Sequence, residues 1–153
     1  MIIESERLRL YPVDDAEMAR LIACEKVPEM KQAYAEMRQG CLNDPENRVW
    51  YAPWYMELRD EPGTVAGDFC FKGPANEGAV EIGYGLRDGF TGRGYMTETV
   101  RAACAWALRQ PDVVRVEAET EPANIASQRV LSRAGFLPTG TQGEEGPRFA
   151  LIK

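Results

Sequence analysis

The chain has 153 residues, of which 44% are hydrophobic and 27% charged, a composition that predicts a single globular domain over residues 1–153. Its net charge of −6 argues against a protein that holds the phosphate backbone of nucleic acid. Histidine is absent and the four cysteines show no Cys-x-x-Cys spacing, which argues against a zinc site and a histidine-based catalytic triad.

The sequence also lacks membrane and targeting signatures. No apolar run reaches the length of a membrane span, and the N-terminus has no hydrophobic signal region. Cys70 and Cys104 fall at apolar positions and are interpreted as small core residues. We therefore expect a reduced, cytoplasmic protein that binds no membrane, no nucleic acid and no metal.

The first half of the chain predicts strands, with two helices after the first of them. Asp14 can cap the first helix, and Pro28 can begin the second. Residues 40–47 are polar and predict a loop. Strands are expected over residues 7–13, 50–60, 65–72 and 79–86.

A stripe of apolar residues at helical spacing follows Pro28. It is interpreted as core, with the wall of a substrate pocket as the alternative, because methionine adapts to varied ligands. The stripe consists of Met30, Ala33, Tyr34 and Met37.

Residues 79–110 combine a strand, a turn with three glycines and a helix. The helix is expected to begin near Met96 or Thr97 and to end before Pro111. A helix that begins directly after glycines is a natural anion site, because free N–H groups converge there and the helix dipole is positive. The turn has neither a Walker ending nor a complete dinucleotide fingerprint, so spacing alone leaves open a turn without a ligand. The glycines are Gly89, Gly92 and Gly94.

The last part of the chain predicts one more helix among three strands. The helix is expected over Asn124–Ala134, closed by Gly135 in a left-handed conformation. The strands are expected over residues 113–120, 136–142 and 148–152. The whole order predicts an α/β fold: a mixed sheet with helices on both faces and a right-handed parallel β-α-β unit at its centre.

Two blocks of the chain resemble the GNAT superfamily of acyl-CoA N-acyltransferases: EIGYGLRDGFTGRGYMTETV and AETEPANIASQRVLSRAGF. The similarity is greatest to the branch that includes the ribosomal-protein N-terminal acetyltransferases, which the opening ESERLRLYPVDDAEM also resembles. The resemblance covers nearly the whole chain. It implies a mixed, mostly antiparallel seven-stranded sheet whose central parallel β-α-β unit binds acyl-CoA.

The resemblance implies acetyl-CoA as co-substrate. The family's loop pattern, Gln/Arg-x-x-Gly-x-Gly/Ala, falls on Thr91, Gly94 and Met96, of which Gly94 matches. The backbone N–H groups of this loop would hold the pyrophosphate, and the pantetheine arm would pair with the preceding strand. Asn124 would hold a pantetheine amide and also cap its own helix. The expected coenzyme A residues are Tyr84, Leu86, Thr91, Gly92, Arg93, Gly94, Tyr95, Met96, Thr97, Asn124 and Ser127.

Glu81 is the expected general base, since several family members place a catalytic glutamate near this position. In a half-dry cleft its pKa could be raised to ~6–7. Glu119, on the following strand, is the alternative base. The oxyanion would meet a strand N–H near Tyr84.

The leaving thiol needs little acid assistance, because a pKa near ~8.5 lets it depart as a thiolate. Many family members carry a tyrosine acid seven residues after the motif asparagine, where this chain has Leu131. Ser127 is therefore the expected hydrogen-bond donor to the sulfur. Without a histidine to activate a cysteine, direct transfer is favoured over a covalent intermediate.

The resemblance, taken together with these residues, implies an N-acetyltransferase that acts by direct attack in a ternary complex. The acceptor is a protein N-terminus or a small amine such as an amino acid, a polyamine or an aminoglycoside. One alternative is a non-catalytic acyl-CoA-binding sensor or scaffold module, and another is a dinucleotide-dependent enzyme. Because family members commonly form dimers, a homodimer is an expected assembly; use of acyl groups other than acetyl stays open.

Overall fold

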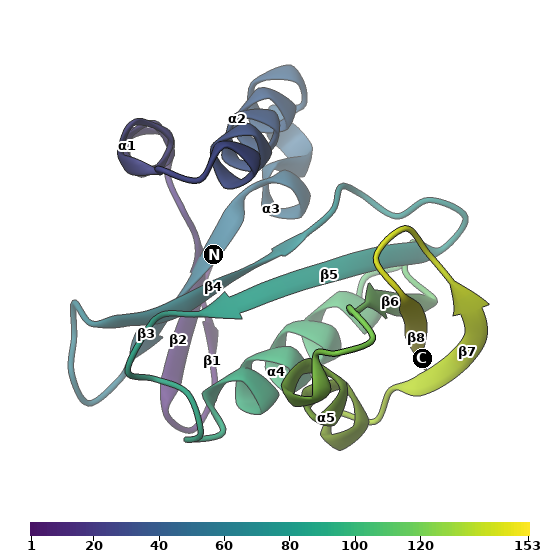
Figure 1. Cartoon of the computed structure of the whole chain (residues 1–153). Helices are drawn as coiled ribbons and strands as arrows, with labels where there is room; N and C mark the ends of the chain where they lie inside the picture. The colour runs from purple at the N-terminus through teal and green to yellow at the C-terminus, as the bar shows by residue number, and fades with distance from the viewer.

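The computed structural model describes all residues, 1–153, and contains one eight-stranded sheet with helices on both faces (Figure 1). The strands are ordered β1-β2-β3-β4-β5-β6-β8-β7. Every neighbouring pair is antiparallel except β5 and β6, which are parallel. The strands are β1 (Ile3–Glu4), β2 (Leu8–Pro12), β3 (Pro53–Leu58), β4 (Val65–Phe71), β5 (Ala79–Leu86), β6 (Arg115–Glu119), β7 (Leu137–Gln142) and β8 (Pro147–Ile152).

The helices divide between the two faces of the sheet. In Figure 1, α1, α2 and α3 lie above the sheet, and α4 and α5 lie below it. None of the helices is long and apolar enough to cross a membrane. Their bounds are α1 (Asp15–Cys24), α2 (Pro28–Asn43), α3 (Arg48–Tyr51), α4 (Tyr95–Leu108) and α5 (Ile125–Arg133), with a short 3-10 helix η1 (Pro45–Asn47) before α3.

This arrangement confirms the predicted mixed sheet and its parallel β5-α4-β6 unit, with two corrections. The sheet has eight strands rather than seven, because the two-residue β1 is too short to show a periodic pattern. The expected loop over residues 40–47 is wrong: α2 continues to Asn43, η1 follows, and α3 replaces the start of the expected strand 50–60. Gly40 can lie inside α2 because the ring of Tyr51 occupies the space of a side chain there.

The main core fills the space between the sheet and α4. The apolar side of α4 packs there through Val100, Ala103, Cys104 and Ala107, all fully buried. A smaller core on the other face holds α1 and α2 through residues such as Met18, Cys41 and Tyr55. Because both faces are packed, β5 is fixed in the middle of the molecule with a helical layer on each side.

Candidate active site

β5 and β6 separate after a short parallel contact. They pair only over residues 79–81 and 115–117, whereas β5 continues to Leu86 and stays paired with β4. In Figure 1 the far half of β5 has no β6 beside it and runs above α4. The space beside the unpaired edge of β5 at Tyr84–Leu86 is called the β5–β6 gap below.

The backbone of β5 presents hydrogen-bonding groups to this gap. The N–H of Arg87 donates to the carbonyl of Ala66 at 2.8 Å, so Arg87 and every second residue before it direct their backbone groups toward β4. The backbone groups of Tyr84 and Leu86 consequently point the other way, into the β5–β6 gap. An extended ligand could pair with this edge as an additional strand.

Three predicted residues meet on the α5 side of the gap. The hydroxyl of Tyr84 lies 2.8 Å from Oγ of Ser127, and burial raises the pKa of Tyr84. Asn124 caps α5 as predicted, accepting a hydrogen bond from the N–H of Ser127 at 3.0 Å. Leu131, at the position of the missing tyrosine, is fully buried in the core.

The turn before α4 carries a run of free donors. Gly94 is the residue before the first turn of α4 and is left-handed, with φ 79°. None of the backbone N–H groups from Gly92 to Thr97 has an acceptor within the protein. Six successive donors at a positive helix end form a cradle suited to an anion such as a pyrophosphate. Thr91 and Arg93 have exposed side chains here, whereas those of Met96 and Thr97 are buried.

Two residues that the sequence analysis missed fix this turn to the N-terminal part of the chain. Arg7 donates to the carbonyl of Arg93 at 2.8 Å and to Glu98 at 2.7 Å, and its guanidinium lies 4.5 Å from the centre of the Tyr95 ring. The N–H of Arg7 also donates to Glu98 at 2.8 Å. Arg7 lies 86 positions before Arg93 in the chain, so no local motif marks the contact.

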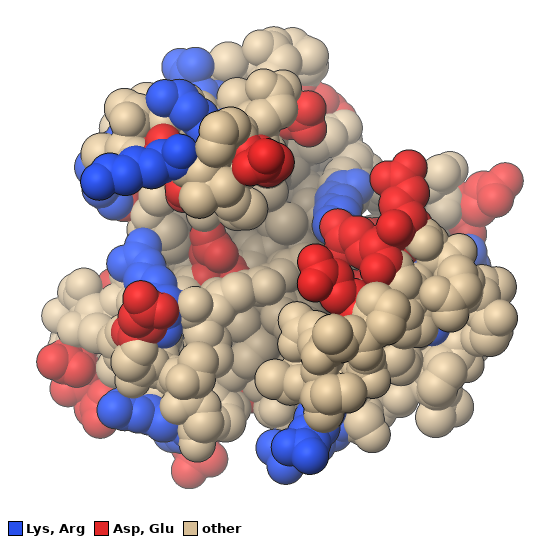
Figure 2. All heavy atoms as spheres, viewed as in Figure 1, with Lys and Arg blue, Asp and Glu red and all other residues tan.

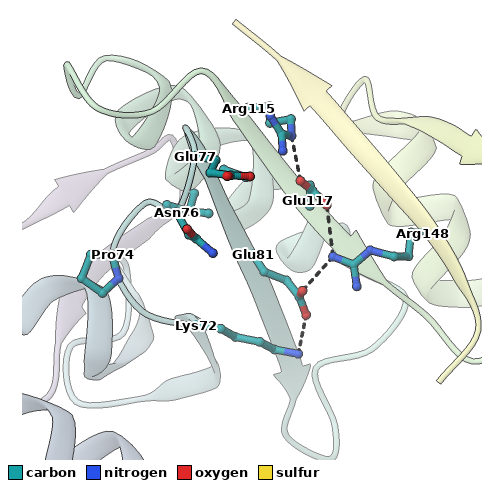
Figure 3. A pocket seen from close by; sticks show the side chains of 10 residues that line it. Lys72, Pro74, Asn76, Glu77, Glu81, Arg115, Glu117 and Arg148 are labelled. Carbon is teal, nitrogen blue, oxygen red and sulfur yellow. Dashed lines mark hydrogen bonds and ion pairs between the residues drawn. The ribbon is translucent and has the colours of Figure 1, made fainter. Parts of the chain in front are cut away.

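Glu81 is held between two cations (Figure 3). Lys72 Nζ and Arg148 Nη2 each lie 2.8 Å from one of its carboxylate oxygens, and its side chain is 26% exposed. Burial acts to raise the pKa of Glu81, but the hydrogen bonds from Lys72 and Arg148 outweigh it and hold the pKa below the ordinary value. The expectation of a raised pKa is therefore wrong, because Lys72, directly after β4, and Arg148, on β8, could not be identified as partners from the sequence.

Glu119, the alternative base, has both carboxylate oxygens occupied. One accepts from Arg148 at 2.6 Å, and the other accepts from the N–H of Glu145 at 2.6 Å. Arg148 also contacts Glu117 at 3.2 Å, so this one arginine joins β5, β6 and β8. Glu119 thereby fixes the turn between β7 and β8.

A hollow opens on the other side of β5, toward α2 and α3. It contains a cavity of about 380 Å³ whose lining includes Met37, Tyr51, Cys70 and Lys72. Figure 2 shows acidic side chains gathered on one rim of the central depression, over the segment of β6 and the β7–β8 turn. Of the apolar stripe in α2, Tyr34 is buried as the core interpretation predicts, Ala33 and Met37 line this cavity, and Met30 is exposed.

The cysteine thiols and the possible metal ligands bear on which chemistry the site can perform. All four cysteines are free thiols, and burial raises the pKa of Cys70 to about 11 and of Cys104 to about 12. Neither thiol is therefore a nucleophile at neutral pH. No group of three or more Cys, Asp or Glu side chains is arranged to hold a metal ion.

Known proteins resemble this chain in sequence. Residues 7–137 match the family described as Acetyltransferase (GNAT) domain. YjdG of Bacillus subtilis, which is named as an N-acetyltransferase, is 30% identical over 84 residues, covering 55% of this chain and 50% of YjdG. This chain spans half or less of the length of the curated relatives that it matches.

Solved structures resemble it in fold. RimL, described as a ribosomal L7/L12 alpha-N-protein acetyltransferase in complex with coenzyme A, superposes with a TM-score of 0.76 at 20% identity, covering 99% of this chain and 98% of RimL. A Salmonella typhimurium acetyl transferase described as modifying the N-terminal serine of protein L7/L12 superposes with a TM-score of 0.75 at 20% identity, covering 100% and 99%. At these identities the likeness bears on the fold alone.

Proposed function

Because the chain belongs to the GNAT acetyltransferase family, we propose that it is an N-acetyltransferase that moves the acetyl group of acetyl-CoA to a primary amine. The observation that carries this proposal is that two surfaces with unpaired backbone groups lie close together on one segment of the chain. The free N–H groups of residues 92–97 follow the free backbone edge at Tyr84 and Leu86, with residues 87–91 between them. Coenzyme A has a pyrophosphate followed by an extended amide-bearing arm, which suits both surfaces.

In this proposal the turn binds the pyrophosphate and the β5–β6 gap binds the pantetheine arm. Asn124 caps α5 through its Oδ1, which leaves its amide NH₂ free to donate to a pantetheine carbonyl. The residues assigned to coenzyme A are Tyr84, Leu86, Thr91, Gly92, Arg93, Gly94, Tyr95, Met96, Thr97, Asn124 and Ser127. We place the reaction in the cytoplasm, where four unpaired cysteines stay reduced.

The chemistry is direct transfer. A neutral amine attacks the thioester carbonyl, the C–N bond forms, the C–S bond breaks, and a base takes the proton that the nitrogen loses. The N–H of Tyr84 would stabilise the oxyanion, since it faces the gap. The Ser127 hydroxyl shares a hydrogen bond of 2.8 Å with the Tyr84 hydroxyl. Ser127 would donate to the departing sulfur.

Glu81 is the proposed base, although its surroundings weaken it. A carboxylate paired with two cations holds a proton poorly. Acceptance of the amine's proton would therefore require that the ion pair with Lys72 opens during the reaction. Lys72 is the more exposed partner, at 48% against 22% for the Arg148 side chain, and it has one carboxylate partner where Arg148 has three.

Release of free thiol from acetyl-CoA tests the proposal. The acceptors are a serine-initiated tetrapeptide, an alanine-initiated tetrapeptide, spermidine and tyramine, which separate a protein N-terminus from small amines. The wild type should release thiol with at least one of them, and Glu81→Gln should lower kcat by about 100-fold. Glu46→Gln, an exposed site in η1, is the matched control and should leave kcat unchanged.

The alternative is a module that binds acyl-CoA without turnover. Binding of coenzyme A by calorimetry, with no thiol release from any amine, would establish that function instead. Circular dichroism of each variant separates loss of chemistry from loss of fold.

A further inference from the structure

Asp68 in β4 is the one acidic residue of the sheet without a basic partner. It forms no ion pair, although it is half-buried. A carboxylate removed from water without a cation destabilises the folded state. The five other acidic residues on strands all pair with Arg or Lys: Glu4, Glu57, Glu81, Glu117 and Glu119.

One of the two Asp68 oxygens is held and the other is open. The hydroxyl of Tyr34, a residue of α2 that is only 7% exposed, donates to Oδ2 at 2.7 Å. Oδ1 accepts no hydrogen bond from the protein, and it is not among the buried polar atoms that lack a partner, so it keeps contact with solvent. Burial raises the pKa of Asp68 despite that hydrogen bond.

The charged groups nearby do not supply the missing cation. Arg87 and Glu25 are close enough to influence Asp68 but form no ion pair with it. Arg87 instead lies over the ring of Tyr55, 5.4 Å from its centre. An arginine, a glutamate and a buried tyrosine therefore surround a carboxylate that has one free oxygen.

Only the glycine backbone of β5 separates Asp68 from the β5–β6 gap. In the β4–β5 register it faces Gly85, and its neighbour on the same face, Cys70, faces Gly83. Neither glycine places a side chain on that face, and a Cβ added to Gly85 would meet nothing within 4 Å. Adjacent strands lie about 4.8 Å apart, so Asp68 is one strand away from the edge that carries the Tyr84 N–H.

We propose that Asp68 binds the ammonium group of the acceptor, and that the acceptor is therefore a primary amine that arrives protonated. It enters from the α1–α2 side as a cation and contacts Oδ1. The nitrogen then gives up a proton to Glu81, the proposed base, and reaches the thioester in neutral form across Gly83 and Gly85. Tyr34 holds the carboxylate in place from α2. This inference rests on the proposed function and names its substrate class: alkylamines and peptide N-termini, whose pKa values of about 8–10 give a cation at neutral pH, rather than anilines.

Kinetics with Asp68→Asn test it. Asparagine keeps the shape and can still accept from Tyr34, but it removes the charge. The KM for whichever of the four amines above the wild type uses best should rise at least about tenfold, with the KM for acetyl-CoA unchanged within about twofold. Asp60→Asn, an exposed residue between β3 and β4, is the matched control and should behave as wild type. An unchanged amine KM in Asp68→Asn overturns the inference.

Tyr34→Phe separates binding from packing. It keeps the carboxylate but removes the tie to α2, so it should lower stability and raise the amine KM less than Asp68→Asn does. Were it to reproduce the full loss of Asp68→Asn, Asp68 would act only through α2, and the inference would fall.

A binding measurement without turnover completes the test. n-Butylammonium chloride is titrated into the coenzyme A-saturated wild type, with n-butanol as the neutral isostere, while the amide NMR signals of Asp68 and Gly85 are followed. The ammonium should shift them in the wild type but not in Asp68→Asn, and butanol should not. Shifts that are equal in the wild type and Asp68→Asn, or absent from both, contradict the inference. Failure of the proposed function gives a different result, which is that the wild type releases no thiol with any amine. In that case there is also no acceptor for Asp68 to bind.

Discussion

Gly94 joins the turn to α4, and its left-handed backbone requires glycine. With φ 79°, alanine at this position is strained, and its Cβ would lie 3.4 Å from the Arg7 guanidinium. We expect Gly94→Ala to lower stability by about 1 kcal/mol and to weaken coenzyme A about tenfold by calorimetry, because the N–H cradle is displaced. Gly63→Ala, with φ 93° and nothing within 4 Å, should lose similar stability but keep its affinity. Equal affinity in both variants would contradict the anion site.

Asp68 should reduce stability at neutral pH. Its pKa is raised in the folded protein, so its contribution is most favourable below the ordinary carboxyl pKa and is lost as the pH rises through the folded value. Asp68→Asn should therefore be more stable than the wild type in urea at pH 7, with the gain disappearing toward pH 3.8, the ordinary value. A variant that is less stable at pH 7 would indicate a purely structural carboxylate.

Single residues were predictable where their partners are close in sequence. Asn124 caps the helix that begins one residue later, and the glycines of the turn precede α4 directly. Glu81 was assigned the wrong pKa direction because Arg148, 67 positions away, reaches it through the sheet. Asp68 escaped notice for the same reason, since only strand register places it opposite Gly85.

At the scale of elements, Arg148 of β8 holds three strands together. Its guanidinium contacts Glu81 of β5 and Glu117 and Glu119 of β6. Arg148→Gln should cost about 2 kcal/mol at pH 7 in urea unfolding, because it leaves three half-buried carboxylates short of a cation. The pKa values of Glu81 and Glu117 are lowered, so this stability is present above their ordinary pKa and is lost as the pH falls.

The difference between wild type and Arg148→Gln should accordingly shrink below about pH 4.5, the ordinary carboxyl value. Arg109→Gln, at an exposed arginine with no ion pair at the end of α4, controls for loss of one positive charge. A difference that is independent of pH would mean that packing of the arginine stem, rather than charge, is what matters.

Elements with strong local signals were found, and those defined by tertiary contacts were not. The periodic apolar face of α4 and the capping Asp14 of α1 fix those helices locally. α3 was read as part of a strand because its aromatic residues also suit a strand, and Gly40 was read as a loop residue although the Tyr51 ring makes it fit inside α2. The separation of β5 from β6 could not be predicted from apolar periodicity, because periodicity does not encode where pairing stops.

At the scale of the whole molecule, two substrates can approach the middle of β5 from opposite sides. The turn before α4 lies on the α4–α5 side of the sheet, and α2 lies on the other side (Figure 1). Residues of α2 line the cavity and contact Asp68. In the proposed enzyme, acetyl-CoA would occupy the first side and the amine the second, so both could be bound at once. The arrangement suits transfer in a ternary complex, for which initial-rate plots that intersect rather than run parallel are the expected kinetic pattern.

Amide hydrogen exchange with and without coenzyme A tests directly whether the backbone of the turn and of the β5 edge binds the coenzyme. We predict that the N–H groups of residues 92–97, which have no acceptor in the free protein, become protected when the coenzyme binds, together with those of Tyr84 and Leu86 on the β5 edge. Binding that leaves these amides exchanging as in the free protein, with protection elsewhere, would contradict the account.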